Sequence, residues 1–275
     1  MHERSCIIIL VSKRNLTFEI IIYSGGPTMK KFLSLVIALM MVCSMVPALA
    51  EKLVLSTEAM FPPYEYVDGD KVVGIDIEIA EAIALKLGYE GIEVMDIAFD
   101  NVIPAVTEGK AAMAMAGLTA NAERMNSVYF SFPYATGIQV IIVKEDSPIA
   151  TIDDLFTANP TIGVQMATTG DVYAGWDFED TGAGKVARFA NGADAIEALK
   201  NGKVDCVMID NEPAKAFVAA NEGLKILETA YAEEDYAIAI AKDNVELLGK
   251  VSAALQDLIA DGTVQTIIDK YIPAE

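Results

Sequence analysis

Residues 99–124 read FDNVIPAVTEGKAAMAMAGLTANAER, and this stretch decides the fold class. Asp100 is a predicted N-cap for a helix that ends at Gly109, and the alternation in AAMAMAG predicts a strand directly after it. The strand leads into small residues, Thr119 and Arg124. A helix that feeds a short strand is the repeating unit of α/β folds.

The alternation of strand and helix continues on both sides of this stretch. The predicted elements are a strand at 52–57 (KLVLST), a helix at 74–89 with Asp76 as its N-cap, strands at 94–99, 138–144 (IQVIIVK) and 235–242 (DYAIAIAK), and two closing helices in 244–272. Two such arrays predict two α/β lobes, each a mostly parallel sheet flanked by helices, with a ligand cleft between them. We expect one lobe to comprise 51–136 and 236–275, and the other 137–235.

The composition restricts the class of protein. Of the 275 residues 53% are hydrophobic, which is enough for one large core or two smaller ones and argues against disorder. The formal net charge is −20. Nucleic acids and anionic membranes need clustered lysine and arginine, so neither is an expected partner. A cationic or zwitterionic ligand fits this charge better.

Residues 29–50 (MKKFLSLVIALMMVCSMVPALA) have the features of a secretory signal peptide. Two lysines precede an apolar run, and small residues stand before the predicted cleavage site after Ala50. An uncleaved membrane anchor and lipidation of Cys43 are the alternatives. Met29 is a better start than the upstream one, and residues 1–50 as a whole form a leader outside the fold. We therefore expect the mature protein in the periplasm or outside the cell.

Several kinds of chemistry are excluded by residue counts. After removal of the leader Cys206 is the only cysteine, so no internal disulfide can form. The only histidine is His2, in the leader, which excludes histidine-based acid-base catalysis and ordinary histidine-rich zinc sites. We expect a monomer that has no cofactor and no metal.

Polar side chains follow four of the predicted strands. They are Glu58 after KLVLST, Thr119 and Arg124 after AAMAMAG, Thr168 and Thr169 after TIGVQ, and Asp210 at the end of DCVMID. If these strand ends face one crevice, the inventory matches an amino acid. Arg124 and helix-end N–H groups suit an α-carboxylate, and Asp210 suits an α-ammonium. Glu58 is then left for a cationic or amide side chain.

Each of these side chains also has an ordinary structural role. The structural alternatives are core packing for Phe61, Tyr64 and Phe99, a surface ion pair with Glu123 or Asp171 for Arg124, and helix capping for Thr168, Thr169 and Asp210. Taken singly, none of the residues identifies a binding site. The site is predicted from their convergence on one crevice.

The chain also resembles a known family in several motifs. These are FPPYEY with GIDIEIAEAIA, the whole of 99–124 followed by YFSFPY, IGVQMATTGDVYA, and GKVDCVMID. They resemble the polar amino-acid-binding component of bacterial ABC importers, a type 2 periplasmic binding protein, in order over 52–272. The resemblance implies two lobes, joined by two crossing segments, that close around one amino acid.

The resemblance also implies roles for individual residues. By this resemblance, Arg124 would bind the α-carboxylate, with help from Thr119 and the Thr168 and Thr169 amides. Asp210 and the Gly117 carbonyl would bind the ammonium, and Ala116 and Gly117 would leave room for the ligand backbone. Phe61 and Phe99 would pack on both sides of the ligand side chain, and Glu58 would contact its polar tip. Many relatives have Asp in place of Glu58 and Gly in place of Ala167. These two departures bear on side-chain specificity and on the backbone of the second-lobe loop.

We expect a secreted solute-binding protein that delivers a polar L-amino acid to a membrane ABC permease by lobe closure. Basic amino acids (arginine, lysine, ornithine) come first because Glu58 would be uncompensated at the side-chain end, and glutamine comes next. The alternative is a periplasmic dehydratase-type enzyme on the same fold, for which Glu58 is the only obvious general acid. We expect a binding protein and not an enzyme.

Overall fold

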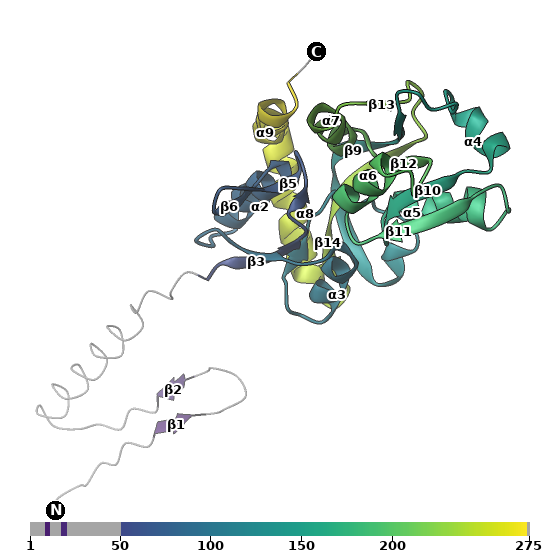
Figure 1. Ribbon diagram of the computed structural model, residues 1–275. Coiled ribbons are helices and arrows are strands. Elements are labelled where there is room, and N and C mark those ends of the chain that lie inside the picture. The colour runs from purple at the N-terminus through teal and green to yellow at the C-terminus, as the bar shows by residue number, and fades with distance from the viewer. Residues whose placement is uncertain (1–8, 12–17, 21–50, 274–275) are drawn as a thin grey trace, which may run out of the picture. The chain divides into compact units, whose positions relative to one another are not determined.

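The computed structural model describes residues 9–11, 18–20 and 51–273 (Figure 1). Contacts divide the chain into two units, 1–49 and 50–275. In the first unit β1 (Ile9–Val11) pairs antiparallel with β2 (Phe18–Ile20). The predicted signal peptide lies outside the described residues. None of the helices in the described ranges combines the length and hydrophobicity that a bilayer span requires.

The strands of the second unit form a nine-stranded and a three-stranded sheet. The larger sheet has the order β11-β10-β12-β9-β14-β8-β3-β7, with β13 paired to β9. Its strands are β3 (Leu53–Thr57), β7 (Ile92–Asp96), β8 (Met113–Ala114), β9 (Val128–Lys144), β10 (Thr161–Gln165), β11 (Lys185–Phe189), β12 (Cys206–Asp210), β13 (Leu224–Ile226) and β14 (Ala232–Ala241). The smaller sheet contains β4 (Met60–Phe61), β5 (Glu65–Asp68) and β6 (Lys71–Val73).

Helices lie between these strands and after the last of them. They are α2 (Ile75–Lys86), α3 (Val102–Thr107), α4 (Ile152–Ala158), α5 (Thr169–Ala174), α6 (Gly192–Lys200), α7 (Asn211–Ala220), α8 (Val245–Ala260) and α9 (Thr263–Tyr271), with short 3₁₀ turns η1 (Phe99–Asn101) and η2 (Arg124–Asn126) and a π-helical turn η3 (Gly175–Glu179). β3 pairs in parallel with β7 and β8, and β10 pairs in parallel with β11 and β12. The predicted α/β class is therefore confirmed.

Two strands cross between the lobes. β9 and β14 run antiparallel to each other, from Gln139 opposite Ala232 to Val128 opposite Ala241 (Figure 1). The strand predicted at 138–144 is thus ten residues too short. Pro133 interrupts the strand pattern in the sequence, because proline has no N–H for a neighbouring strand. In the structure Pro133 lies opposite Ala237, where the register between β9 and β14 shifts, and such an irregular position tolerates the missing N–H.

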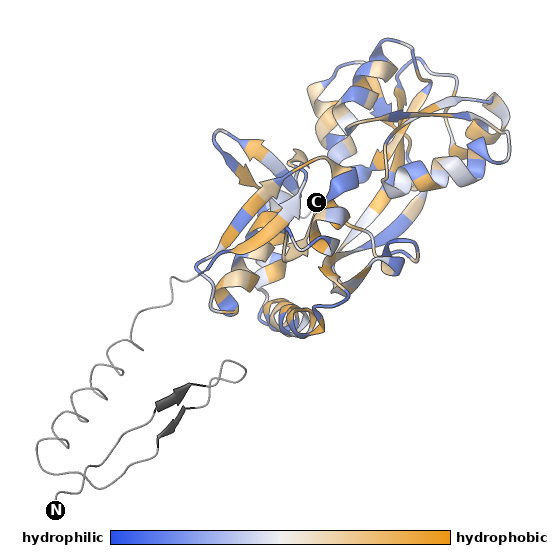
Figure 2. Cartoon of the chain, turned by 90° about the horizontal axis from the view of Figure 1, so that it is seen from below, coloured by the Kyte–Doolittle hydropathy of each residue, from blue (hydrophilic) through white to orange (hydrophobic). Residues whose placement is uncertain are grey.

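Each lobe has its own hydrophobic core. Residues between Leu53 and Ala135 pack with those between Tyr236 and Ile272. Residues between Ile138 and Tyr231 form two further clusters, and Phe61 of the first lobe also packs against one of them. In Figure 2 the apolar residues gather along the strands, and the loops are mostly hydrophilic. The lobe boundaries at 136/137 and 235/236 stay a prediction.

Two predicted N-caps are wrong. The N-cap of α2 is Gly74, and Asp76 lies in the first turn, fully buried, where its Oδ2 accepts from the Gly117 N–H at 3.0 Å. Asp100 lies in the turn η1, and the N-cap of α3 is Asn101, whose side chain makes no capping bond. Both aspartates lie close to the strand ends instead of capping helices.

Candidate functional site

The polar strand ends face one narrow cavity between the lobes. It is lined by Phe61, Phe99, Ala116, Gly117, Arg124, Gln139, Gln165, Thr168, Thr169, Met208, Ile209 and Asp210. Eight of the ten predicted site residues are in this set. Glu58 and Thr119 are not, and each of them contacts a lining residue instead.

A wider groove adjoins the cavity. It has a volume of about 500 Å³ and shares Phe99 and Arg124 with the cavity, and it is walled by the first lobe at Asn121 and by the second at Trp176. The inner cavity has only about 20 Å³ of free space, which is room for about one water molecule. The inner cavity in this structure is therefore too small to hold an amino acid.

Arg124 connects the two lobes. Its Nη1 donates to the Thr119 carbonyl at 3.0 Å and its Nη2 to the Ala167 carbonyl at 3.2 Å. The guanidinium carbon lies 5.4 Å from the centre of the Phe99 ring. Burial lowers the pKa of Arg124, and the nearby carboxylate of Glu234 raises it; the group stays charged in either case.

The surface ion pair considered for Arg124 is not formed by the described residues. Asp171, one of its two predicted partners, is 2.7 Å from the Nε of Arg188. Arg124 bonds only backbone carbonyls, so its charge is not neutralised by a direct carboxylate contact within the described part of the chain. It can therefore receive an anionic group.

Asp210 ends β12 and turns its carboxylate away from helix α7. It occupies the N-cap position of α7 but makes no capping bond. Its Oδ2 accepts from the Gln139 Nε2 at 2.5 Å, and its Oδ1 accepts from the Tyr236 hydroxyl. Burial, followed by the charge of Glu234, raises the pKa of Asp210 well above its ordinary value. A cation placed beside Asp210 would relieve this destabilisation of the charged form.

Gly117 supplies backbone to the cavity at a position that excludes larger residues. Its φ is +54°, and a Cβ there would lie 2.8 Å from the Phe61 ring. Its N–H is held by Asp76, and Ala116 beside it is only 2% exposed. Both of these small residues, which follow β8, line the cavity.

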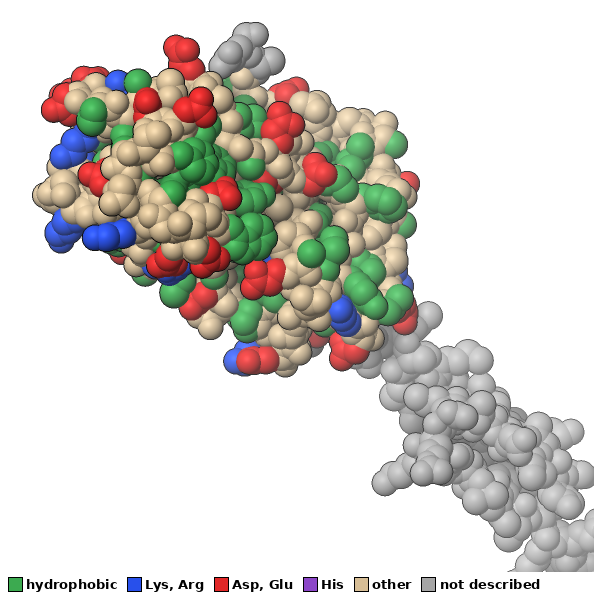
Figure 3. All heavy atoms as spheres, turned by 90° about the vertical axis from the view of Figure 1, so that its right-hand side faces the viewer, with side chains coloured by type: hydrophobic (Ala, Val, Ile, Leu, Met, Phe, Trp, Pro, Cys, Tyr) green, Lys and Arg blue, Asp and Glu red, His purple; other side chains and the backbone are tan. Residues whose placement is uncertain are grey.

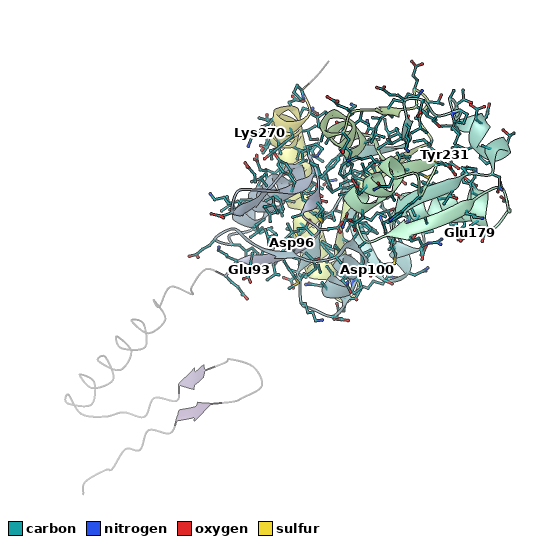
Figure 4. All side chains as sticks on the ribbon, viewed as in Figure 1. Glu93, Asp96, Asp100, Glu179, Tyr231 and Lys270 are labelled. Atoms are coloured by element: carbon teal, nitrogen blue, oxygen red, sulfur yellow. The ribbon has the colours of Figure 1, made fainter. Side chains whose placement is uncertain are left out.

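Glu58 lies just behind the cavity lining. It is 6% exposed, and its Oε2 accepts from the Gln165 Nε2 at 2.5 Å, a bond that joins the two lobes. Burial raises the pKa of Glu58, and the charges of Asp96 and Asp100, both labelled in Figure 4, act in the same direction, whereas the bond from Gln165 lowers it. A positive group placed near Glu58, in addition to one beside Asp210, would stabilise its charged form.

The threonines have distinct positions. Thr168 is the N-cap of α5, where its Oγ1 accepts from the Asp171 N–H at 3.3 Å, so the predicted capping role is present. Thr169 lines the cavity, and its Oγ1 donates to Glu234 at 2.8 Å. The Thr119 Oγ1 donates to the same carboxylate at 3.0 Å.

Sequence reasoning missed three buried polar residues of the site: Gln139 on β9, Gln165 at the end of β10, and Glu234 on β14. They are 1%, 5% and 5% exposed. The available signal was a polar side chain within or at the end of an apolar strand, as in IQVIIVK and TIGVQ. Such residues are rarely buried without a partner.

Comparisons with known proteins agree with this geometry. The family model of bacterial extracellular solute-binding proteins, family 3, matches residues 53–274. The arginine-binding extracellular protein ArtP of Bacillus subtilis (strain 168) is 32% identical over 228 residues, 82% of this chain and 88% of the relative.

Solved structures are similar over the same part of the chain. An ancestral arginine-binding protein bound to arginine has a TM-score of 0.74 and 38% identity, covering 81% of this chain and 99% of that one. The arginine-, lysine-, histidine-binding protein ArtJ of Geobacillus stearothermophilus has a TM-score of 0.75 and 34% identity, covering 82% and 96%. The predicted two-lobed type 2 periplasmic-binding-protein fold is confirmed by these structures. The chain belongs to family 3 of the bacterial extracellular solute-binding proteins.

Proposed function

We propose that this protein captures a polar L-amino acid between its lobes and delivers it to a membrane ABC permease. Basic amino acids (arginine, lysine, ornithine) are the first candidates and glutamine the next. One observation carries the proposal: the guanidinium of Arg124 and the buried carboxylate of Asp210 line one interlobe cavity, and the buried carboxylate of Glu58 lies directly behind its lining. A zwitterion with a cationic side chain complements these three charges.

Each charge has a role in this proposal. Arg124 pairs with the α-carboxylate, together with Thr119 and the Thr168 and Thr169 backbone amides, since a guanidinium and helix-end N–H groups both favour anions. Asp210 and the Gly117 carbonyl receive the α-ammonium. The Phe61 and Phe99 rings flank the aliphatic part of the side chain, and Glu58 meets its tip, either directly or through Gln165.

The similar proteins support this choice of ligand. ArtP is named as an arginine-binding protein, and ArtJ as one that binds arginine, lysine and histidine. The ancestral protein has been solved bound to arginine and also bound to glutamine. A site that accepts either ligand is what a carboxylate at the side-chain end permits, because it can bond a guanidinium or an amide.

Closure of the lobes is the proposed mechanism. Hydrogen bonds already cross between the lobes, among them those from Arg124 to the Ala167 carbonyl and from Gln165 to Glu58. A ligand that contacts both lobes favours the closed state by its difference in affinity for the two states. The permease then recognises the closed form. We further propose that the protein acts as a monomer outside the cytoplasm, as the description of its family as extracellular suggests.

The enzyme alternative finds no support in the comparisons, because the family and the similar proteins bind and transport solutes. A dehydratase would need Glu58 as a protonated general acid beside a leaving group. A cationic ligand would instead keep Glu58 ionised. Calorimetric binding of arginine without product formation supports the binding protein, and turnover of an arogenate-like substrate would overturn it.

A thermal-shift screen tests the ligand class. The mature protein is melted in the presence of each of the twenty amino acids and ornithine. A ligand that binds only the folded state raises the melting temperature, so a basic amino acid is expected to give the largest shift, with glutamine next. The proposal is wrong if no amino acid shifts the transition.

A further inference from the structure

Glu234 is a buried acid on the crossing strand β14, directly behind the cavity lining. Its Oε2 accepts three hydrogen bonds, from the Thr119 Oγ1 at 3.0 Å, the Thr169 Oγ1 at 2.8 Å and the Gln139 Nε2 at 3.2 Å. The donors come from the first lobe, the second lobe and the crossing strand β9. Glu234 thus lies at the point where these three parts of the site meet.

The polarity of the two hydroxyl groups follows from this arrangement. An ionised carboxylate can only accept, and a hydroxyl has a single proton to donate. Thr119 and Thr169 therefore direct their protons to Glu234 and offer only lone pairs to any other group. For Thr169 this agrees with its second neighbour, the Gln139 Nε2, a donor 3.4 Å from the same oxygen.

A further acceptor atom beside these threonines is unpartnered. The Oε1 of Gln139 is buried and receives no hydrogen bond from the described residues. Gln139 lines the cavity, and its amide nitrogen bonds Asp210 at 2.5 Å. The amide orientation is fixed by the two carboxylates, because an oxygen in place of Nε2 would face them without a proton. This wall of the cavity therefore offers acceptors and few donors.

We propose that Glu234 is a positioning residue for the ligand's α-ammonium group. Because it accepts the hydrogen bonds of the Thr119 and Thr169 hydroxyls, it leaves both oxygens as acceptors, and Thr169 lines the same cavity as Asp210. The α-carboxylate is left to the Arg124 guanidinium and to backbone N–H groups. This inference rests on the proposed function, and it adds a residue that selects which end of an α-amino acid lies against this wall.

The test compares wild type with Glu234→Gln by calorimetry on three probes: L-arginine, agmatine, which lacks the α-carboxylate, and 5-guanidinopentanoate, which lacks the α-ammonium. The amide that this substitution introduces can donate to the threonine hydroxyls and turn their protons toward the cavity. We expect the variant to bind arginine and agmatine about tenfold more weakly. Its affinity for 5-guanidinopentanoate should be unchanged or higher. Equal losses for all three probes, or no loss, would overturn the inference.

Variants at Thr169 test the same inference independently of whether Glu234→Gln folds. Thr169→Val should weaken arginine and agmatine but not 5-guanidinopentanoate, and Thr169→Ser, which keeps the hydroxyl, should bind as wild type. In the double variant Glu234→Gln/Thr169→Val the losses should be smaller than their sum, since Glu234 acts through the hydroxyl. Additive losses would contradict the inference that Glu234 acts through the Thr169 hydroxyl.

The outcomes also separate this inference from the proposed function. If the wild type binds arginine but Glu234→Gln and Thr169→Val lose affinity for all three probes alike, the role of Glu234 is refuted and the proposed function stands. Wild-type protein that binds no amino acid refutes both. Thermal melting of the ligand-free variants shows whether each one is folded.

Discussion

Ala167 has a backbone conformation that a side chain makes unfavourable. Its φ is +66°, in the left-handed region, and its carbonyl accepts from the Arg124 Nη2. The loop holds this conformation where its carbonyl meets Arg124, and alanine adopts it with strain.

Ala167→Gly should therefore stabilise the protein. Relief of the strained conformation outweighs the extra freedom of glycine in the unfolded chain, so we expect a gain of about 0.5–1 kcal/mol in the free energy of unfolding. Urea denaturation measures it. The matched control is Ala219→Gly on the exposed side of α7, which should cost about 0.5–1 kcal/mol. Destabilisation by both substitutions would show that the loop is not strained.

Glu58→Gln should change the order of ligand preference. The substitution removes the negative charge that a guanidinium or an ammonium would meet, while an amide ligand can still bond the new side chain. We expect arginine affinity to fall about tenfold or more and glutamine affinity to change much less, measured by calorimetry. Arg124→Ala is the control, since loss of an α-carboxylate contact should weaken both ligands alike. Equal losses in Glu58→Gln would remove Glu58 from side-chain recognition.

At the level of elements, local signals predicted what is local. The alternation in AAMAMAG, the strand KLVLST and the two closing helices follow from short-range periodicity, and all are present. The extension of β9 to Val128 and the roles of Gln139 and Glu234 depend on pairing between β9 and β14. Glu234 lies opposite Gly137, almost a hundred residues earlier, and a single sequence contains no short-range sign of that contact.

Asp76 and Glu65 show the same limit. From the local sequence, Asp76 near the start of α2 is predicted to be an N-cap. In the structure Glu65 on β5 lies near Asp76, and both carboxyls are fully buried. The Asp76 Oδ1 accepts from the Tyr134 hydroxyl at 2.7 Å. Neither oxygen of Glu65 receives a hydrogen bond from a described residue. Burial and then the charge of Asp76 raise the pKa of Glu65 well above its ordinary value.

This pair makes stability depend on pH. The Glu65 carboxyl keeps its proton in the folded state at pH values where the unfolded chain has lost it, above about pH 4.5. Its contribution to the free energy of unfolding is therefore complete below that pH and is lost as pH rises through the raised pKa. Wild type should therefore lose stability, relative to Glu65→Gln, as pH increases from 5 to 8. The limiting slope is about 1.4 kcal/mol per pH unit for one proton.

Chemical denaturation at several pH values measures this difference. The charges of Asp76, Glu58 and Asp210 also raise the pKa of Glu65. These three acids are therefore kept in both proteins, and both denaturation curves are measured without added ligand. Glu93→Gln, an exposed position on β7 labelled in Figure 4, is the control and should follow wild type. A constant difference between wild type and Glu65→Gln across the range would mean that Glu65 is ionised in the fold.

At the scale of the whole molecule, charge should govern how fast a ligand arrives. The formal net charge is −20, and acidic side chains are spread over the face shown in Figure 3. The groove that leads to the cavity is lined by Asp100, Glu123, Asp171, Glu179 and Asp180, with only Arg124 and Arg188 as cations. Such a field attracts arginine, which has a net positive charge, and exerts little net force on glutamine, which has none.

Salt should therefore slow the binding of arginine selectively. The screening length falls from about 30 Å at 0.01 M salt to about 10 Å at 0.1 M. Over that change we expect the association rate constant of arginine, measured by stopped-flow tryptophan fluorescence, to fall about threefold or more. Trp176, the single tryptophan, lines the groove and provides the signal. Glutamine is the matched control, because the same lobe motion admits it without net attraction. If salt slowed both ligands equally, the effect would lie in lobe opening and not in attraction of the ligand.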